Sequence, residues 1–371
     1  MERCKRNEHG FLWRIIVFVL SLFAFIGLVG MGLSVLCSYV DPSRFVWLSF
    51  FGLAFWEILL YNIIVMMLLF MLKTRKVWIA ILAVLLAIPG IAKSYSYGKP
   101  EEGGELCVMS YNVQNFKHIK YPERAREDVA FDIAKMVRDN DVDLLCIQEF
   151  ASFSSKKSRN ECIRSFSDML NLPYVYYHTK DYFCGNVIFS KYPVSALTDS
   201  CEIGKEKAYG AIAHVDAGEK GSFDMLCAHL TSYHLTDEEV NIFTEKGNAK
   251  ENVETYGKSI ISKLRVAFTC RSAEVNMLLS DLQDDNRNLL LCGDFNDTPL
   301  SYTYQQIKKA GYSDSFVAVG KGIGTTYAGK LPLLRIDYLW TNSSIQPKSF
   351  TRLRFKGSDH YPVMMRFDVN H

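Results

Sequence analysis

Polar side chains able to carry acid–base and metal chemistry stand directly after short apolar runs in this sequence. The clearest case is residues 289–297, where Leu-Leu-Leu-Cys leads into Gly-Asp-Phe-Asn-Asp. A continuous apolar run ended by glycine and acids predicts a buried strand that continues into a loop. Asp294 and Asn296 alternate around Phe295, so their side chains are expected on the same side of the chain. A carboxylate and a carboxamide held there can orient a water molecule and donate a hydrogen bond to a charged oxygen.

The same arrangement recurs at the ends of several other predicted strands, the usual location of a site on an α/β scaffold. Taken singly, each polar residue has a structural explanation, such as a polar turn, a cap, an ion pair or a surface histidine. Their joint recurrence at strand ends favours a common site. The candidates are Asn112, Glu149, His229, Asp294, Asn296, Asp337, Asp359 and His360.

The elements that must position these residues follow from the spacing of apolar side chains. Helical spacing predicts helices over 123–140, 162–170, 253–282 and 301–310. Short apolar runs predict strands near 106–110, 143–148, 174–177, 186–190, 209–215, 223–229, 289–294, 336–340 and 363–367. Strands outnumber helices and only some alternate with them, which predicts a mixed α/β sandwich.

One charged residue lies on the apolar face of the longest predicted helix. Arg271 follows Phe268 by three residues and precedes Val275 by four. A guanidinium in that position requires a buried anionic partner.

The first 93 residues are predicted to be a membrane anchor with three transmembrane helices, over about 15–38, 46–72 and 77–92. The third stretch is the shortest, and Trp78 and Tyr95 stand at its ends as interface anchors do. Glu57 is the one charge inside the second stretch, and a role in helix packing is expected for it. Residues 94–105 are predicted to be a linker, and 106–371 a globular domain.

Charge is unevenly distributed between these parts. The first 100 residues hold 10 of the 42 basic and 4 of the 40 acidic residues, a net charge of +6, which leaves −4 on the other 271. Basic residues before the first helix and after the second place the N-terminus in the cytoplasm by the positive-inside rule. We therefore expect an integral protein of the inner or plasma membrane with its globular part outside the cytoplasm. If the third helix does not span, that part is cytosolic.

Ten cysteines are present, and their spacing does not indicate a zinc site. Cys107, Cys146, Cys227 and Cys292 stand inside apolar runs, where a thiol packs as a small hydrophobic group. Oxidation of the others outside the cytoplasm stays open, because the sequence does not choose pairs.

Seven short stretches occur in an order that resembles the endonuclease/exonuclease/phosphatase superfamily, whose relatives include DNase I-like nucleases, sphingomyelinases and inositol-polyphosphate phosphatases. Each stretch is weakly specific, but the seven in order are strongly so and extend over the whole globular part. They are 109–113 (MSYNV), 145–149 (LCIQE), 185–190 (GNVIFS), 228–230 (AHL), 293–296 (GDFN), 335–338 (RIDY) and 358–362 (SDHYP).

This resemblance implies a four-layered α/β sandwich with two facing mixed β-sheets and a metal-dependent phosphoester hydrolase site at one end. Asn112 and Glu149 would bind Mg²⁺, with Mn²⁺ as an alternative, since hard oxygen ligands suit these ions. Asp294 would orient or deprotonate the attacking water, and Asn296 would hold a phosphoryl oxygen.

The resemblance also implies roles for both histidines. His360, paired with Asp359, would sit at the phosphate, and His229 would contact it from the other side, oriented by Asp337. Three further residues are expected to help bind substrate, Arg271 chiefly as a support for the site: Lys207, Arg271 and Asn186.

The substrate stays open between a lipid head group, a small phosphoester and nucleic acid. A net charge of −4 on the globular part argues against tight binding to a phosphate backbone, and a tether in the bilayer favours lipids or small phosphoesters. A nuclease outside the cytoplasm is the first alternative. The alternative from another class is a catalytically inactive, membrane-bound binding protein. The lipid bilayer is an expected partner, and the sequence indicates no protein partner.

Overall fold

The computed structural model describes residues 10–177, 185–196, 210–241, 249–282, 288–329 and 333–370. Internal contacts divide the chain into two compact units. The first comprises Met1–Lys93 with Leu300–Gln305, and the second comprises Ser94–Pro299 with Gln306–His371.

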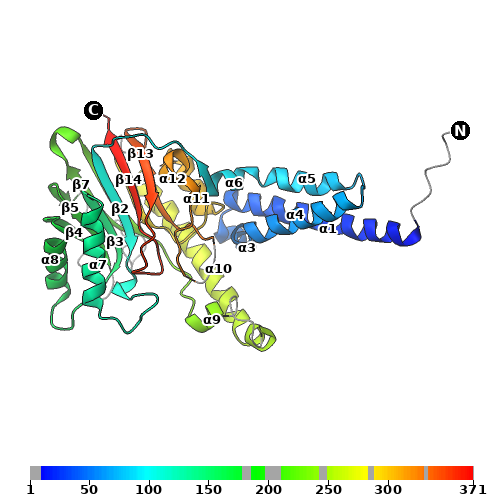
Figure 1. The fold of residues 1–371 in the computed structure, drawn as a ribbon, viewed down its shortest axis with the longest axis horizontal. Coiled ribbons are helices and arrows are strands. Elements are labelled where there is room, and N and C mark those ends of the chain that lie inside the picture. Colours follow the sequence, from blue (N-terminus) through cyan, green and yellow to red (C-terminus); the bar gives the residue numbers. More distant parts are fainter. Residues whose placement is uncertain are drawn as a thin grey trace. The chain divides into compact units, whose positions relative to one another are not determined.

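The first unit is built from apolar helices (Figure 1). Its elements are α1 (Phe11–Leu36), η1 (Cys37–Tyr39), α2 (Pro42–Phe45), α3 (Trp47–Leu53), α4 (Phe55–Met71), α5 (Val77–Leu86) and most of α6 (Ile88–Ser94). Two helical segments, Phe11–Tyr39 and Val77–Ser94, are long and apolar enough to cross a membrane.

The predicted continuous helix over 46–72 is interrupted. Helices α3 and α4 meet at Ala54 with a bend of 66°, so they form a third candidate span only if the bent pair is one span. Gly52 stands two residues before the break, where a side chain would collide with the Cys37 thiol. Close packing of α3 onto η1 at this glycine thus coincides with the change in direction.

The second unit contains two six-stranded mixed sheets. One has the order β13-β14-β2-β3-β5-β4, and the other has the order β10-β12-β9-β8-β7-β6. Their strands are β2 (Leu106–Asn112), β3 (Leu144–Phe150), β4 (Tyr174–Tyr177), β5 (Gly185–Ser190), β6 (Val194–Ala196), β7 (Gly210–Asp216), β8 (Ser222–His229), β9 (Leu289–Asp294), β10 (Ser313–Asp314), β12 (Asp337–Thr341), β13 (Ile345–Arg352) and β14 (Val363–Val369).

The two sheets face each other and bury a common apolar core. Residues of both sheets form one buried cluster, and Val108, Leu144, Met225 and Leu290 within it have no solvent exposure. A second core fills the space between the first sheet and two helices, α7 (Arg126–Asp139) and α8 (Arg159–Leu170).

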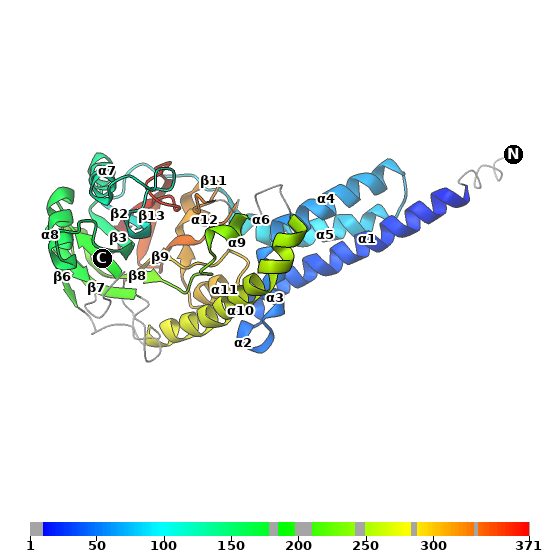
Figure 2. The same ribbon diagram turned by 90° about the horizontal axis from the view of Figure 1, so that it is seen from below.

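Helices complete the outer layers. On the side of the second sheet lie α10 (Ala249–Asp281), α11 (Tyr302–Lys309) and α12 (Ser315–Val319), as Figures 1 and 2 show. The remaining helical segments that the structure describes are η2 (Gln114–Phe116), η3 (Gly218–Lys220) and α9 (Asp237–Asn241). The predicted four-layered α/β sandwich with two facing mixed sheets is confirmed.

The segment predicted to be a linker, 94–105, begins with a strand. β1 (Tyr95–Tyr97) pairs with β11 (Lys321–Ile323), and Ser96 Oγ donates a hydrogen bond to the Val317 carbonyl of α12. Gly98, just after this strand, lies so close to the carbonyls of Gly320 and Ala318 that a side chain would collide with them. The start of this segment is therefore part of the second unit, which its glycine and acidic residues did not indicate.

Strand register brings the polar strand ends to one edge. β2 and β3 are parallel, as are β8 and β9, so their carboxyl ends fall side by side. His229 pairs with Asp294 across β8 and β9, and Asp337 pairs with Asp294 because β12 runs antiparallel to β9.

Gly293, which precedes Asp294 in β9, is expected to be irreplaceable. Its φ of 147° suits glycine, and a Cβ there would collide with the Ala228 carbonyl of the neighbouring strand. We predict that Gly293→Ala lowers the free energy of unfolding by about 2–4 kcal/mol, because a backbone clash adds to the strained φ. Urea titration of the full chain in detergent, followed by circular dichroism, measures the loss.

Gly218→Ala is the matched control. Gly218 also has a positive φ, of 63°, but no atom lies within 4 Å of its added Cβ. This variant is expected to lose only about 1 kcal/mol, the cost of the left-handed backbone alone. Equal losses in the two variants would show that contact with Ala228 is not what constrains Gly293.

Candidate active site

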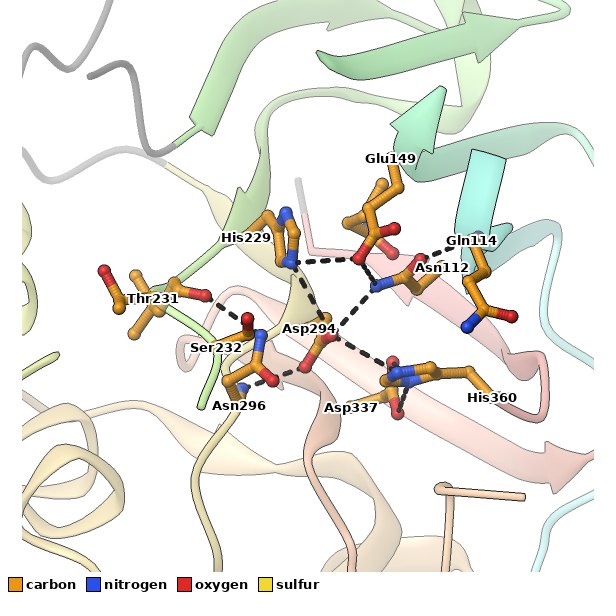
Figure 3. Close-up of polar contacts among 12 residues, drawn as sticks. Asn112, Gln114, Glu149, His229, Thr231, Ser232, Asp294, Asn296, Asp337 and His360 are labelled. Carbon is orange, nitrogen blue, oxygen red and sulfur yellow. Dashed lines mark hydrogen bonds and ion pairs between the residues drawn. The ribbon is translucent and has the colours of Figure 1, made fainter. Parts of the chain in front are cut away.

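Asp294 is the centre of a cluster of polar side chains at the shared edge of the two sheets (Figure 3). Its side chain is fully buried at the end of β9. Oδ2 accepts a hydrogen bond from Asn112 Nδ2 at 3.0 Å and lies 3.6 Å from His360 Nε2. Oδ1 accepts a hydrogen bond from the backbone N–H of Asn296 at 2.9 Å.

Asn112 and Glu149 lie together at the ends of the parallel strands β2 and β3. Asn112 Nδ2 donates to Glu149 Oε1 at 3.1 Å, and Asn112 Oδ1 accepts from the backbone N–H of Gln114 at 3.0 Å. The Glu149 side chain is 25% exposed, so its carboxylate faces both the cluster and solvent. Its backbone has φ 56°, and the β3–β5 register shifts between Ile147 and Phe150, so a bulge aims this side chain.

Asp337 orients His360, which corrects the predicted pairing of His360 with Asp359. His360 Nδ1 lies 2.9 Å and 3.1 Å from the two carboxylate oxygens of Asp337. Asp359 is partly exposed, and its Oδ1 accepts a hydrogen bond from Ser358 Oγ at 3.2 Å. The prediction relied on Asp359 and His360 being neighbours in sequence, but successive side chains of an extended segment point in opposite directions.

The predicted pairing of His229 with Asp337 is also wrong. Asp294 stands between them, since it is the register partner of both His229 on β8 and Asp337 on β12. His229 Nε2 lies 3.7 Å from Glu149 Oε1 and 3.8 Å from Asp294 Oδ2. It is buried and makes no hydrogen bond with any residue that the structure describes, so this nitrogen points into the centre of the cluster.

Arg271 supports the loops that carry the cluster. It is completely buried on α10, its Nη1 donates to the Thr231 carbonyl at 2.9 Å, and its Nε lies 3.3 Å from Asp297 Oδ2. Asp297 is the buried anionic partner that its position required. Glu274, one turn further along α10, accepts hydrogen bonds from both the backbone N–H and the hydroxyl of Thr231. The segment that follows His229 is thus fixed by two charged residues of one helix.

The remaining predicted site residues differ in their placement. Asn296 has φ 51°, and its Nδ2 donates to the Leu230 carbonyl at 2.9 Å. Asn186 lies near the start of β5, whose register opposes the bulge at Glu149. Lys207 lies outside the described residues.

Sequence reasoning missed Asn115. Its Nδ2 lies 3.4 Å from Glu149 Oε2, so an amide reaches each oxygen of that carboxylate. Gln114, Asn115 and Phe116 have φ values of 45°, 55° and 59°, a run of strained residues directly after β2. Phe116 holds the run in place, since its ring packs 5.1 Å from that of Phe150. Asparagine adopts the left-handed region more readily than most residues, so the residue type was the one indication in the sequence that Asn115 takes this conformation.

Burial and neighbouring charges shift the pKa values of Asp294 and His360. Burial raises the pKa of Asp294, the Asp337 carboxylate adds to the rise, and His360 opposes it. Burial by itself lowers the pKa of His360, but the carboxylates of Asp337 and Asp294 outweigh it, and the net pKa is well above its ordinary value. At neutral pH the cluster therefore contains an imidazolium beside carboxylates.

The donor set fits a divalent cation. Glu149 offers a carboxylate that is partly exposed, and each of its oxygens keeps a free lone pair beyond the amide it accepts from. The ligand atoms of Asp294, Asp337 and His360 also lie within 4.8 Å of one another. Hard oxygen ligands with room for water are what Mg²⁺ and Mn²⁺ prefer.

A model of the Endonuclease/Exonuclease/phosphatase family matches residues 109–360 of the sequence. The chain belongs to this family. Family members hydrolyse phosphoesters and generally use divalent metal ions, so the chain is a phosphoester hydrolase. The matched range begins just before Asn112 and ends at His360, and so contains the whole cluster. Residues 14–94 match a second family model, described as a domain of unknown function (DUF8431).

Solved structures with a similar fold include three enzymes or family members from bacteria. An endonuclease/exonuclease/phosphatase from Beutenbergia cavernae is 16% identical over 72% of each chain, with a TM-score of 0.48. A mannosyl-6-phosphatase from Bacteroides thetaiotaomicron is 16% identical over 71% of this chain and 99% of its own, with a TM-score of 0.48. A 3′ phosphatase from Neisseria, bound to a product DNA hairpin, is 15% identical over the same shares, with a TM-score of 0.48. No curated protein matches the chain.

The Asp337–His360 pair predicts the pH dependence of hydrolysis. Because Asp337 raises the pKa of His360, the imidazolium persists through neutral pH in the wild type and is lost only as pH rises through that elevated pKa. Asp337→Asn removes the larger of the two carboxylate contributions that oppose burial, so the alkaline limb of kcat/KM against pH should move to lower pH. The pair's contribution to stability should likewise be present at acidic pH and disappear as pH rises through the folded-state pKa.

Asp359→Asn is the control for this profile. Asp359 raises the pKa of His360 only as the weakest of the contributing carboxylates and makes no hydrogen bond to it. Its alkaline limb should therefore move less than that of Asp337→Asn. A larger displacement in Asp359→Asn would contradict the assignment of Asp337 as the orienting group.

Proposed function

We propose that the protein is a membrane-anchored, Mg²⁺-dependent phosphoester hydrolase. Residues 1–93 serve as the anchor and 106–371 form the catalytic domain, while the predicted linker 94–105 contributes β1 to the second unit. The observation that carries the proposal is the convergence of polar side chains on the buried Asp294 carboxylate, which Asn112 Nδ2, His360 Nε2 and His229 Nε2 approach to 3.0, 3.6 and 3.8 Å. Glu149 Oε1 joins this cluster through Asn112 Nδ2 at 3.1 Å and His229 Nε2 at 3.7 Å.

Glu149 and Asn112 would hold Mg²⁺, Glu149 through its carboxylate and Asn112 through the lone pair of Oδ1 that the Gln114 backbone N–H leaves free. When bound, the ion supplies positive charge that polarises the phosphoryl oxygens and offsets the charge that grows on them. Asn115 and Asn112 each place an amide N–H on a Glu149 oxygen and fix the carboxylate in one orientation. Such support of a ligand by neighbouring groups is typical of metal sites.

Asp294 is the residue best placed to take a proton from an attacking water. Burial raises its pKa toward the range in which a carboxylate can both accept and release a proton. The Asn296 backbone N–H and Asn112 Nδ2 occupy one lone pair on each of its oxygens and fix its direction. A lone pair remains on each oxygen for the water.

The two histidines flank this carboxylate and supply donors to the phosphoryl group. His360 carries its charge at neutral pH and presents Nε2 toward Asp294. His229 Nε2 is buried and makes no hydrogen bond to any described residue. This is expected of an atom that binds a substrate oxygen or a water molecule during the reaction. Asn296 holds a phosphoryl oxygen with the part of its amide that Leu230 does not use.

The substrate class that fits best is a phosphoester presented at or near a bilayer, either a lipid head group or a small soluble phosphoester. Two segments of the first unit are long and apolar enough to span a membrane, and the remaining 271 residues after position 100 have a net charge of −4. Hydrolysis outside the cytoplasm is supported by the basic residues that flank the first two predicted spans, and it requires that the bent pair α3–α4 form one span. Nucleic-acid substrates require a local basic surface, which the net charge does not favour.

Removal of the Glu149 carboxylate should separate metal binding from folding. Glu149→Ala is expected to weaken Mg²⁺ binding by at least about tenfold and to lower kcat/KM by roughly 10²–10⁴, since the loss of a ligand removes the aligned charge. Isothermal titration with Mg²⁺ and hydrolysis of bis-p-nitrophenyl phosphate and p-nitrophenyl phosphate measure the two effects. Glu127→Ala, at an exposed position of α7, is the control. Wild-type Mg²⁺ affinity in Glu149→Ala would exclude it as a ligand.

A substrate panel and a carbonate wash test the rest of the proposal. The wild type should remain in membranes after the wash, and protease should digest residues 106–371 from outside intact spheroplasts. With Mg²⁺ it should hydrolyse sphingomyelin or a small phosphoester faster than plasmid DNA, and EDTA should stop the reaction. Faster cleavage of DNA would identify the nuclease alternative, and Mg²⁺ binding without any hydrolysis would indicate a binding protein.

A further inference from the structure

A groove in the helical first unit is lined almost entirely by apolar side chains. It has a volume of about 650 Å³ and lies between α1, α3 and α4. Phe25, Val29 and Leu33 of α1 form one side, and Phe51 of α3 with Ile58 of α4 forms the other. Gly30 contributes no side chain, which leaves the groove open along α1. Its dimensions suit a flexible hydrocarbon chain.

Glu57 is the one acidic residue that lines this groove. The expectation that it serves helix packing is wrong, because its side chain is exposed. Among the described residues it has no ion-pair partner, although an intramembrane carboxylate is costly unless a cation or a donor accompanies it. Tyr61, one turn along α4, also lines the groove, and its hydroxyl is occupied by the Phe23 carbonyl at 3.0 Å.

The position of Glu57 along α4 places it in the leaflet opposite the basic residues that follow this helix. From Glu57 to the end of α4 at Met71 the helix rises about 21 Å, at about 1.5 Å per residue, and three basic residues follow at 73, 75 and 76. A hydrocarbon core is about 30 Å thick. If the basic residues stand at one surface, Glu57 stands near the opposite one, and the groove along the C-terminal half of α1 falls within that leaflet.

We propose that this groove binds one phospholipid whose head group carries an ammonium, with an acyl chain in the groove and the ammonium at Glu57. Charge selects the head group, because the carboxylate attracts an ammonium and repels an anionic head group. The rings of Phe25, Phe51 and Tyr61 also line the groove, and an aromatic face attracts a cation placed over it. This inference rests on the proposed anchoring in a bilayer, and it assigns the anchor a lipid preference of its own.

Binding of tail-labelled phospholipids to the full chain in detergent micelles tests the proposal. Wild type should bind phosphatidylethanolamine at least about fivefold more tightly than phosphatidylglycerol. Glu57→Gln should bind phosphatidylethanolamine about tenfold more weakly and lose the preference, as expected when a charge-assisted contact is removed. Helix content by circular dichroism verifies that each variant is folded.

Two glycines of α1 give a matched pair of variants for the groove itself. Gly30 lines the groove, with Ile58 Cγ2 3.7 Å from its added Cβ, whereas Gly32 has no atom within 4 Å. Gly30→Leu should fill the groove and weaken binding of both lipids by about tenfold. Gly32→Leu should bind both lipids as the wild type does.

Equal binding of the two lipids by the wild type, or undiminished binding in folded Gly30→Leu, would overturn the inference. A dimer in the wild type that Gly30→Leu converts to a monomer would also overturn it, by assigning the groove to a second copy of the chain. These failures are distinguishable from failure of the proposed function. If the protein withstands a carbonate wash and hydrolyses a soluble phosphoester, only the lipid site is wrong; if the wash releases it, the anchoring is wrong.

Discussion

Burial of the Asp294 carboxylate is the constraint on which the site depends. A carboxylate without solvent contact is stable only if protein groups replace its lost hydration. Here the replacements are Asn112 from β2, the Asn296 backbone from the following turn, and His360 from the segment before β14. These groups come from both sheets, so the requirement to solvate one buried charge also fixes the alignment of the sheets at this edge.

The same constraint accounts for the unusual backbone around the site. Glu149, Asn115 and Asn296 all have positive φ, and each brings a polar group to the cluster that regular strand geometry would direct elsewhere. Arg271 and Glu274 of α10 supply the support from behind, since they fix the loops that follow β8 and β9. Strain of this kind persists only where the surrounding contacts over-determine the conformation.

Much of the architecture was predictable because apolar periodicity reports directly on strands and helices. The run at 289–294 is strand β9, and the long helix predicted over 253–282 is α10. The partners of the histidines were not predictable, because they depend on strand order. Asp337 is at the site because β12 pairs with β9, and His360, in the segment before β14, lies within hydrogen-bonding distance of it. Strand β1 was not predicted for a similar reason, because its pairing partner β11 lies more than 220 residues away in the sequence. Asn115 was missed because its contribution depends on a turn conformation that spacing does not reveal.

The pairing of β2 with β14 has a consequence for the order in which the enzyme folds. Ser110 pairs with Val363, and β2 obtains its other neighbour, β3, much earlier in the chain. Contacts between segments so distant in sequence form slowly, because a long loop must close first. Asn112 and His360 therefore meet only after nearly all intervening elements have been synthesised and docked. Catalytic competence is thus a late event in maturation, and a partly folded chain would be harmless to the phosphoesters around it.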